Sequence, residues 1–181
     1  MVGPKRLPHE PRPVFQLGGE ARVLIAGQAP GVRVHASGRP FTDPSGDRLR
    51  RWLGIDAEVF YDSKRVAILP MGLCFPGLSP TGSDLPPRPE CAPRWRHRLL
   101  ALLPRLELVV ALGRHAQDWH LEAGGSSLDA TVRNWRQALE RRPPVLPMPH
   151  PSWRNNAWLK RNPWFEAEVV PELRRRVALL L

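Results

Sequence analysis

Two short segments, more than a hundred residues apart, carry residue types that could do chemistry together. GQAPG, residues 27–31, directly follows an apolar run at residues 22–26, and HPSWRN, residues 150–155, directly follows another at residues 145–149. Each pair reads as a buried strand that ends in a loop. Ligands of open parallel α/β sheets bind outside the carboxyl ends of the strands, so the two loops are expected to share one site. Backbone N–H groups, a histidine and a serine could there bind a phosphate-bearing substrate and stabilise an anionic leaving group.

Length and composition favour one domain of ordinary type. The 181 residues suit a single core, and 42% hydrophobic residues is usual for a globular chain. We expect an irregular N-terminal arm over residues 1–20, which hold four prolines and do not read as a signal peptide, followed by one α/β domain over residues 21–181. Apolar stretches near twenty residues are missing, so no membrane span is expected. Two cysteines do not make a disulfide framework, which favours a cytoplasmic location.

The charge of the chain points to a polyanionic partner. The formal net charge is +10, and all but three of the 27 basic residues are arginine, whose planar guanidinium suits phosphate. A basic surface of this kind predicts salt-sensitive binding of nucleic acid. Codon usage in a GC-rich genome would also enrich arginine and proline, and this alternative stays open.

The order of apolar runs and amphipathic segments predicts the fold class. Strands are expected at residues 22–26, 66–69, 106–112 and 144–148. Helices are expected at residues 45–53, 91–103, 113–121, an exposed 128–141, and 157–180 with interruptions at Pro163 and Pro171. Long loops are expected at residues 27–44 and 76–89. Strands that alternate with helices predict an α/β three-layer sandwich with a central four-stranded parallel sheet flanked by helices.

Four segments in this order resemble the uracil-DNA glycosylase superfamily, most closely its family 4 and family 5 branches. GQAPG resembles the first superfamily motif, and residues 38–53 resemble the segment that carries a base-stacking phenylalanine. VVALGRHA, residues 109–116, resembles the third strand and the start of its helix, and HPSWRN resembles the motif of the catalytic histidine. The resemblance covers residues 23–165 and implies a uracil-DNA glycosylase-like fold that acts on a base flipped out of DNA.

The chain departs from these branches at three places. Family 4 and 5 enzymes hold an iron–sulfur cluster with four cysteines, whereas only Cys74 and Cys91 are present, so we expect no cluster, no metal and no other cofactor. Ala29 takes the position at which other branches place a water-positioning aspartate or asparagine, although family 5 likewise lacks a polar group there. Residues 69–72, Leu-Pro-Met-Gly, lack the asparagine that reads the uracil edge, which leaves the identity of the base open.

His150 is the expected catalytic donor. Cleavage of an N-glycosidic bond leaves negative charge on the base, and an imidazole behind a strand could donate to a base carbonyl. A buried histidine bonded to backbone is the structural alternative. The backbone N–H groups of Gln28 and Ala29 could add further donors.

Phe41 is expected to stack on the flipped base, although a phenylalanine after proline could equally anchor the core. Gly27, Pro30 and Gly31 are expected to line the base, because glycine permits a close approach of the backbone. A simple turn is the alternative for this segment.

Water activation has several candidates. Asp43 and Asp47 flank the turn before helix 45–53, and family 5 carries an aspartate in a similar stretch, but one residue fewer separates the threonine from the serine here. We take Asp43 as the candidate and keep Asp47 and His35 as alternatives. Either aspartate could instead cap the helix or serve as an acid of its first turn.

Residues that could hold DNA flank the same loops. Ser152, the turn before helix 45–53 and the start of helix 113–121 could bind phosphates. Trp153 and Arg154 follow the histidine motif, where superfamily members insert a wedge into the gap that the flipped base leaves; packing of Trp153 against Trp158 is the alternative. The full set expected to contact DNA is Ser45, Gly46, Gly113, Arg114, Ser152, Trp153 and Arg154.

These patterns predict a monofunctional DNA glycosylase that removes a deaminated or damaged base, uracil first, by hydrolysis in base excision repair. Two alternatives stay open: the same reaction on hypoxanthine or xanthine, and a DNA- or lesion-binding protein without catalysis. DNA, single- or double-stranded, is the expected partner. We expect no membrane partner, no obligate protein partner, and a monomer in a bacterial-type cytoplasm, close to the nucleoid through its DNA binding.

Overall fold

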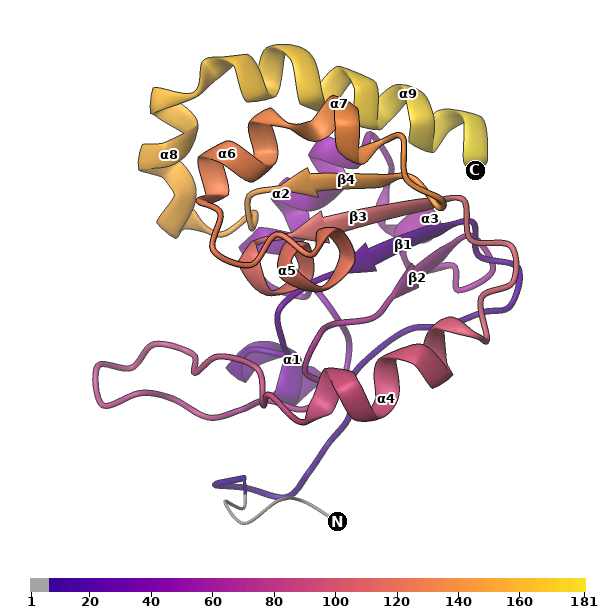
Figure 1. The fold of residues 1–181 in the computed structure, drawn as a ribbon. Helices are drawn as coiled ribbons and strands as arrows, with labels where there is room; N and C mark the ends of the chain where they lie inside the picture. The colour runs from indigo at the N-terminus through magenta and orange to yellow at the C-terminus, as the bar shows by residue number, and fades with distance from the viewer. Residues whose placement is uncertain (1–6) are drawn as a thin grey trace.

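A four-stranded parallel sheet forms the centre of the computed structural model, which describes residues 7–181 (Figure 1). The strands are β1 (Val23–Ala26), β2 (Val66–Ile68), β3 (Leu108–Leu112) and β4 (Val145–Met148), in the order β2-β1-β3-β4. Every residue in these strands is buried. Continuous apolar runs are typical of strands covered on both faces, which is why the sequence could indicate them.

Helices cover both faces of the sheet, so the predicted three-layer α/β architecture is confirmed. Ile25 points to one face of the sheet, where it belongs to a hydrophobic cluster. The helices that contribute side chains to this cluster are α2 (Pro44–Leu53), α3 (Ala57–Tyr61), α6 (Leu128–Arg133), α7 (Trp135–Ala138) and α9 (Val170–Leu180). Leu24, next to Ile25, faces a cluster with α4 (Cys91–Leu100) and α5 (Arg114–Leu121). Successive side chains of a strand point to opposite faces, which divides the core in this way.

The segment after β1 differs from the expectation of one long loop. Residues 32–37 form a short helix, α1 (Val32–Ser37), which ends at Gly38 in the left-handed conformation. The predicted helix that follows is confirmed as α2, with Asp43 as its N-cap and Pro44 in its first turn. Helix α3 was not expected at all. Helices of five or six residues carry too few turns for a periodic apolar pattern to show.

Two further expectations are corrected in the second half of the chain. The helix expected at residues 128–141 is two helices, α6 and α7, and Val132, Trp135 and Ala138 are buried rather than exposed. The last helical region breaks before Pro163, after α8 (Asn156–Arg161), but Pro171 does not interrupt it. A π-helical turn, η2 (Phe165–Val169), precedes α9, and Pro171 lies in the first turn of α9, where a proline is tolerated.

The N-terminal segment lies against the edge of the sheet. Within the described part, residues 7–20 form no helix or strand, and residues 1–6 of the predicted arm lie outside it. Gln16 exchanges two backbone hydrogen bonds of 2.8 Å with Ile68 of β2, and Val14 donates to the carbonyl of Leu73 at 2.8 Å. Over residues 7–181, no helix combines the length and apolarity that a membrane span requires.

Candidate functional site

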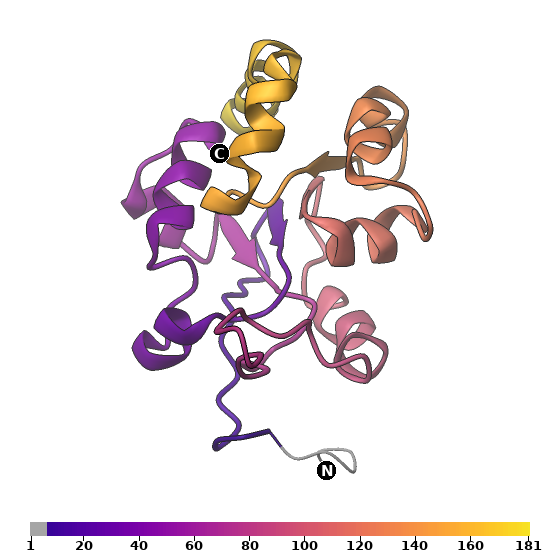
Figure 2. The same cartoon turned by 90° about the vertical axis from the view of Figure 1, so that its left-hand side faces the viewer.

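A cavity of about 590 Å³ opens at the carboxyl ends of the strands, the side that faces the viewer in Figure 2. It is lined by residues 27–31 after β1, by residues of the turn before α2, by the loop after β4, and by Asp84 and Leu85 of the loop at residues 76–89. A depression of about 840 Å³ lies elsewhere, over α6 and α7, and holds none of the predicted site residues. We therefore take the smaller cavity, which combines apolar walls with convergent polar groups, as the candidate site.

Most residues selected from the sequence line this one cavity. They are Gly27, Gln28, Ala29, Pro30, Gly31, Phe41, Asp43, Ser45, His150, Ser152, Trp153 and Arg154. Gly46 and Gly113 lie behind the wall, and Arg114 is exposed on α5, where it pairs with Asp118 at 3.6 Å. Loops that are far apart in the sequence thus meet at one edge of the sheet.

The histidine loop is held in place by polar groups around its backbone. The Asn155 side chain donates to the carbonyl of His150 at 2.7 Å. The buried Gln117 side chain donates to the carbonyl of Met148, the last residue of β4, at 2.9 Å. Sequence reasoning missed Gln117, although a glutamine on the apolar side of α5 was a visible signal. These bonds fix the direction in which the chain leaves β4.

The His150 side chain is half-buried in the cavity wall. Burial lowers its pKa from the usual value for histidine; the nearby Asp43 opposes this shift and Arg154 adds to it. The imidazole is therefore neutral at pH 7 and carries one N–H donor and one acceptor. In the described part of the chain it makes no hydrogen bond with backbone, so the structural alternative of a tethered histidine does not describe it.

Phe41 serves both as a core contact and as a wall of the cavity. Its ring lies edge-on to Phe60 with centroids 6.0 Å apart, and its carbonyl accepts a hydrogen bond of 3.1 Å from the Tyr61 hydroxyl. The backbone of Phe41 has a φ of 54°, a strained value for a residue with a side chain. A Cβ atom at Gly27 would lie 3.7 Å from the ring, an ordinary contact distance, so Gly27 is the direct neighbour of the ring in the cavity wall.

Asp43 is the only one of the three candidates for water activation that lines the cavity. Its Oδ1 caps α2 by accepting from the backbone N–H of Gly46 at 3.3 Å and from the Ser45 hydroxyl at 2.5 Å. Asp47 instead pairs with Arg50 over a separate depression. His35 lies in α1, where its ring packs against His9 with centroids 4.3 Å apart. Asp43 therefore both caps α2 and lines the cavity.

Asp84 joins the cavity from the loop at residues 76–89 and was not foreseen from the sequence. A Cβ atom at Gly31 would lie 3.2 Å from its Oδ2, and the neighbouring Leu85 carbonyl accepts from the Gln28 side chain at 3.4 Å. Partial burial raises the pKa of Asp84, Arg154 opposes the shift, and Asp43 adds to it. The length and proline content of the loop were the only sequence signals for its role.

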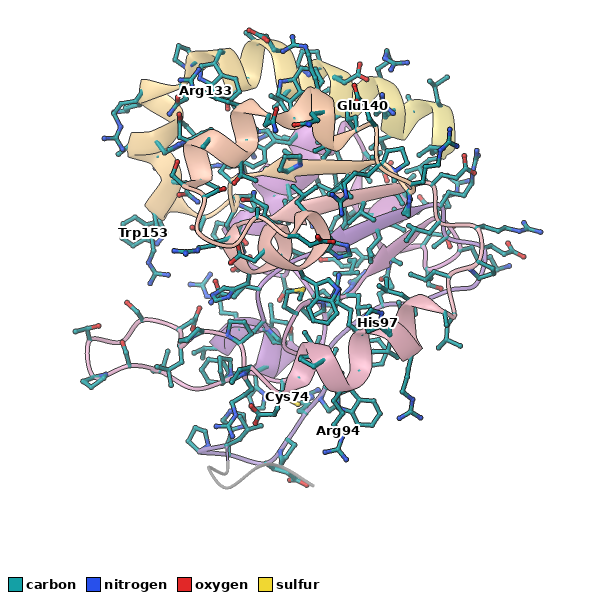
Figure 3. All side chains as sticks on the ribbon, in the orientation of Figure 1. Cys74, Arg94, His97, Arg133, Glu140 and Trp153 are labelled. Atoms are coloured by element: carbon teal, nitrogen blue, oxygen red, sulfur yellow. The ribbon has the colours of Figure 1, made fainter. Side chains whose placement is uncertain are left out.

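The rim of the cavity carries an exposed aromatic residue and a cation. Trp153, in η1 (Trp153–Asn155), is 72% exposed and extends from the molecule on the same side as the loop at residues 76–89 (Figure 3). Trp158 packs against Trp164 and Phe165 instead, so the alternative of a Trp153–Trp158 contact is wrong. Arg154 lies across the mouth, with its guanidinium 3.5 Å from the Ser83 hydroxyl.

The two cysteines do not fit an iron–sulfur cluster. Cys74 and Cys91 are free and half-buried, and the chain has no other cysteine to complete a set of four thiolates. The Cys91 sulfur accepts from the backbone N–H of Leu73 at 3.3 Å. Burial raises the pKa of both thiols, which does not favour the thiolates that a cluster needs.

A family model described as the uracil DNA glycosylase superfamily matches residues 15–174. The match includes all four strands and nearly every segment that lines the cavity. Members of this superfamily act on DNA, so the match supports a DNA glycosylase-type function with DNA as the substrate. The extent of the match and the parallel α/β architecture agree: the chain belongs to the uracil DNA glycosylase superfamily.

Proposed function

We propose that this protein is a monofunctional DNA glycosylase that hydrolyses the N-glycosidic bond of a flipped, deaminated or damaged base, uracil first among them. The observation that carries the proposal is the common cavity of His150, Phe41 and Asp43, which brings a donor, an aromatic face and a carboxylate together. Its volume of about 590 Å³ is in the range of small-ligand sites. A flipped nucleotide is a ligand of this size.

His150 is proposed to stabilise the leaving base. Negative charge develops on a carbonyl oxygen of the base as the glycosidic bond breaks, and a neutral imidazole can donate its N–H to that oxygen. The lowered pKa of His150 supports the neutral form at pH 7. The backbone N–H groups of Gln28 and Ala29, in the same wall, are proposed as further donors. Donors that are fixed before the reaction cost no reorganisation when the charge appears.

Phe41 and Asp43 are proposed to act on the base and on the sugar respectively. The phenylalanine ring offers a stacking face in the cavity wall, beside Gly27. The sugar passes through a cation-like state, which a nearby carboxylate stabilises. The cap of α2 holds Asp43 in position for this role, since its Oδ1 already accepts two hydrogen bonds.

The rim of the cavity is proposed to hold the DNA around the flipped nucleotide. Arg154 can pair with a phosphate, and Trp153 is exposed enough to enter the gap that the flipped base leaves. Ser45 and Ser152 line the cavity and are proposed to share this role, as is Arg114, which is exposed on α5. Gly46 and Gly113, which the sequence also suggested, lie behind the wall, and the Gly46 N–H already donates to Asp43, so the rim role is not assigned to them. A net charge of +10 supports affinity for either single or double strands.

A different base is the second candidate within the same reaction class. Pro70 lines the cavity from the stretch at residues 69–72, which holds no asparagine, and a proline has no side-chain amide with which to read a base edge. This observation favours testing hypoxanthine and xanthine beside uracil. The class of reaction is the same, because each of these bases leaves as an anion stabilised through a carbonyl oxygen.

Base release from defined oligonucleotides tests the proposal. The purified protein and its His150→Ala variant would be incubated with labelled single- and double-stranded DNA that carries one uracil, hypoxanthine, xanthine or T·G mismatch. Alkali then converts abasic sites to breaks. Breaks at one lesion that are lost in the variant, with DNA binding retained, are expected. Salt-sensitive binding without breaks at any lesion would instead indicate a DNA-binding protein without catalysis.

A further inference from the structure

Asp84 is held at the cavity by an ordered loop, although the loop contains no helix or strand. The Leu78–Asp84 pair forms an antiparallel bridge, and the backbone N–H of Leu85 donates to the carbonyl of Gly77 at 2.9 Å. Ser79 closes the tip, since its carbonyl accepts from Gly82 at 2.9 Å and its hydroxyl accepts from the Ser83 N–H at 3.1 Å. These bonds give the Asp84 carboxylate a defined place opposite Gly31.

The position of Asp84 in the cavity corresponds to the sugar rather than to the base. Asp84 is exposed at the mouth, whereas His150 and Phe41 are half-buried in the wall. When a nucleotide enters the cavity, its base goes in first and its sugar stays at the mouth. Water therefore reaches the sugar carbon C1′ at the mouth. A carboxylate at the mouth is therefore placed for the water and not for the carbonyl oxygen of the base.

Asp84 also has more free hydrogen-bonding capacity than Asp43. Oδ1 of Asp43 already accepts from the Gly46 N–H and from the Ser45 hydroxyl. Within residues 7–181, neither carboxylate oxygen of Asp84 makes a hydrogen bond, so both are available to a water molecule. A carboxylate that orients an attacking water and takes its proton needs these free lone pairs.

We propose that Asp84 is the general base of the glycosylase reaction, an assignment that rests on the proposed function above. Asp84 accepts a hydrogen bond from water at the mouth of the cavity. As the C1′–N bond breaks, its electron pair goes to the base, whose carbonyl oxygen receives the hydrogen bond of His150. The water oxygen forms the new bond to C1′, and its proton passes to the Asp84 carboxylate and then to solvent.

The charges around Asp84 suit this role. Asp43, at the start of α2, and Arg154, in η1, are the charged groups that act on it, and they oppose each other. Partial burial raises the pKa of the Asp84 carboxyl group. A carboxylate with a raised pKa holds the proton of water more strongly, and general bases work best when their pKa lies close to the working pH.

Three variants test the assignment under single-turnover conditions on the lesion that the wild type cleaves. Asp84→Asn keeps the shape and removes the proton acceptor. Asp43→Asn keeps a capping residue at α2. Asp129→Asn, at an exposed acid of α6 that pairs with Arg133 outside the cavity, controls for the change in net charge. DNA affinity and thermal unfolding are measured for each protein.

We expect base release by Asp84→Asn to fall by roughly 10²- to 10⁴-fold, the usual contribution of general-base catalysis, with DNA affinity and unfolding temperature unchanged. We also expect the dependence of the rate on an acidic group to disappear from its pH profile. Asp129→Asn should behave as the wild type. Release by Asp84→Asn within threefold of the wild type would overturn the assignment while leaving the proposed function intact. A wild type that releases no base from any lesion would overturn both.

Discussion

Gly46 lies so close to Phe41 that a Cβ atom added to the glycine would fall 1.9 Å from the Phe41 carbonyl oxygen. The first turn of α2 therefore packs directly on the backbone of the proposed stacking residue. The contact is with backbone, which cannot rotate away as a side chain can. Gly46 thus controls the place of the Phe41 ring without touching the cavity itself.

Gly46→Ala is expected to displace Phe41 and to slow base release by about tenfold or more. The added methyl group must move either α2 or the strained Phe41 backbone, and overpacking of this kind costs about 1–3 kcal/mol. The rate is measured in single turnover and the stability by denaturant unfolding. Gly124→Ala is the matched control, because a Cβ atom there meets nothing within 4 Å. Equal rates for both variants would show that the Phe41 position does not matter.

His150→Gln is expected to reduce base release by roughly 10²- to 10³-fold, the usual effect of removing one preorganised donor. DNA binding should change little, because the imidazole acts on the leaving base. Burial lowers the pKa of His150, so protonation begins below the usual histidine range. The wild-type rate should therefore show no titration of this group between about pH 6.5 and 8. A clear histidine titration in this window would contradict the neutral donor.

Arg154→Ala is expected to weaken binding to all DNA sequences about equally. A side chain that pairs with one phosphate releases about one counterion, so the slope of log affinity against log salt should decrease by about one. Fluorescence anisotropy at several salt concentrations measures the slope. Arg175→Ala removes the same charge from α9, where Arg175 pairs with Glu172. If both variants change the slope equally, the effect comes from net charge and not from the site.

His120 is expected to make the fold sensitive to acid. Burial is the main cause that lowers its pKa to about 3, and the Arg96 guanidinium beside it adds to the effect. The unfolded chain takes up a proton near pH 6.5 while the folded chain does not, so stability is lost as the pH falls below that value. We expect a loss of about 2 kcal/mol from this group between pH 6.5 and 5. Denaturant unfolding of wild type and His120→Gln at both pH values measures it; equal losses would contradict the prediction.

The parallel sheet and the two motif loops could be predicted from the sequence because they depend on local pattern. Apolar runs such as β3 are buried on both faces, and loops after such runs reach the same edge whatever lies between them. Asp43 was among the caps that the sequence allowed for α2, and the structure selects it, with Pro44 in the first turn. Helices α1 and α3 could not be predicted, because helices this short are stabilised by tertiary contacts rather than by their own periodicity.

Amino-acid sequence alone therefore determined the fold class and most residues of the candidate site. Only the tertiary structure decided which acids enter the cavity. Asp43 and Asp47 are four residues apart in one segment. The Asp43 side chain lines the cavity, whereas the Asp47 side chain pairs with Arg50 on the outer surface. Asp84 enters through packing of a long loop on residues 28 and 31, and no local pattern specifies such a contact between distant segments. Long-range packing, not residue type, completes the site.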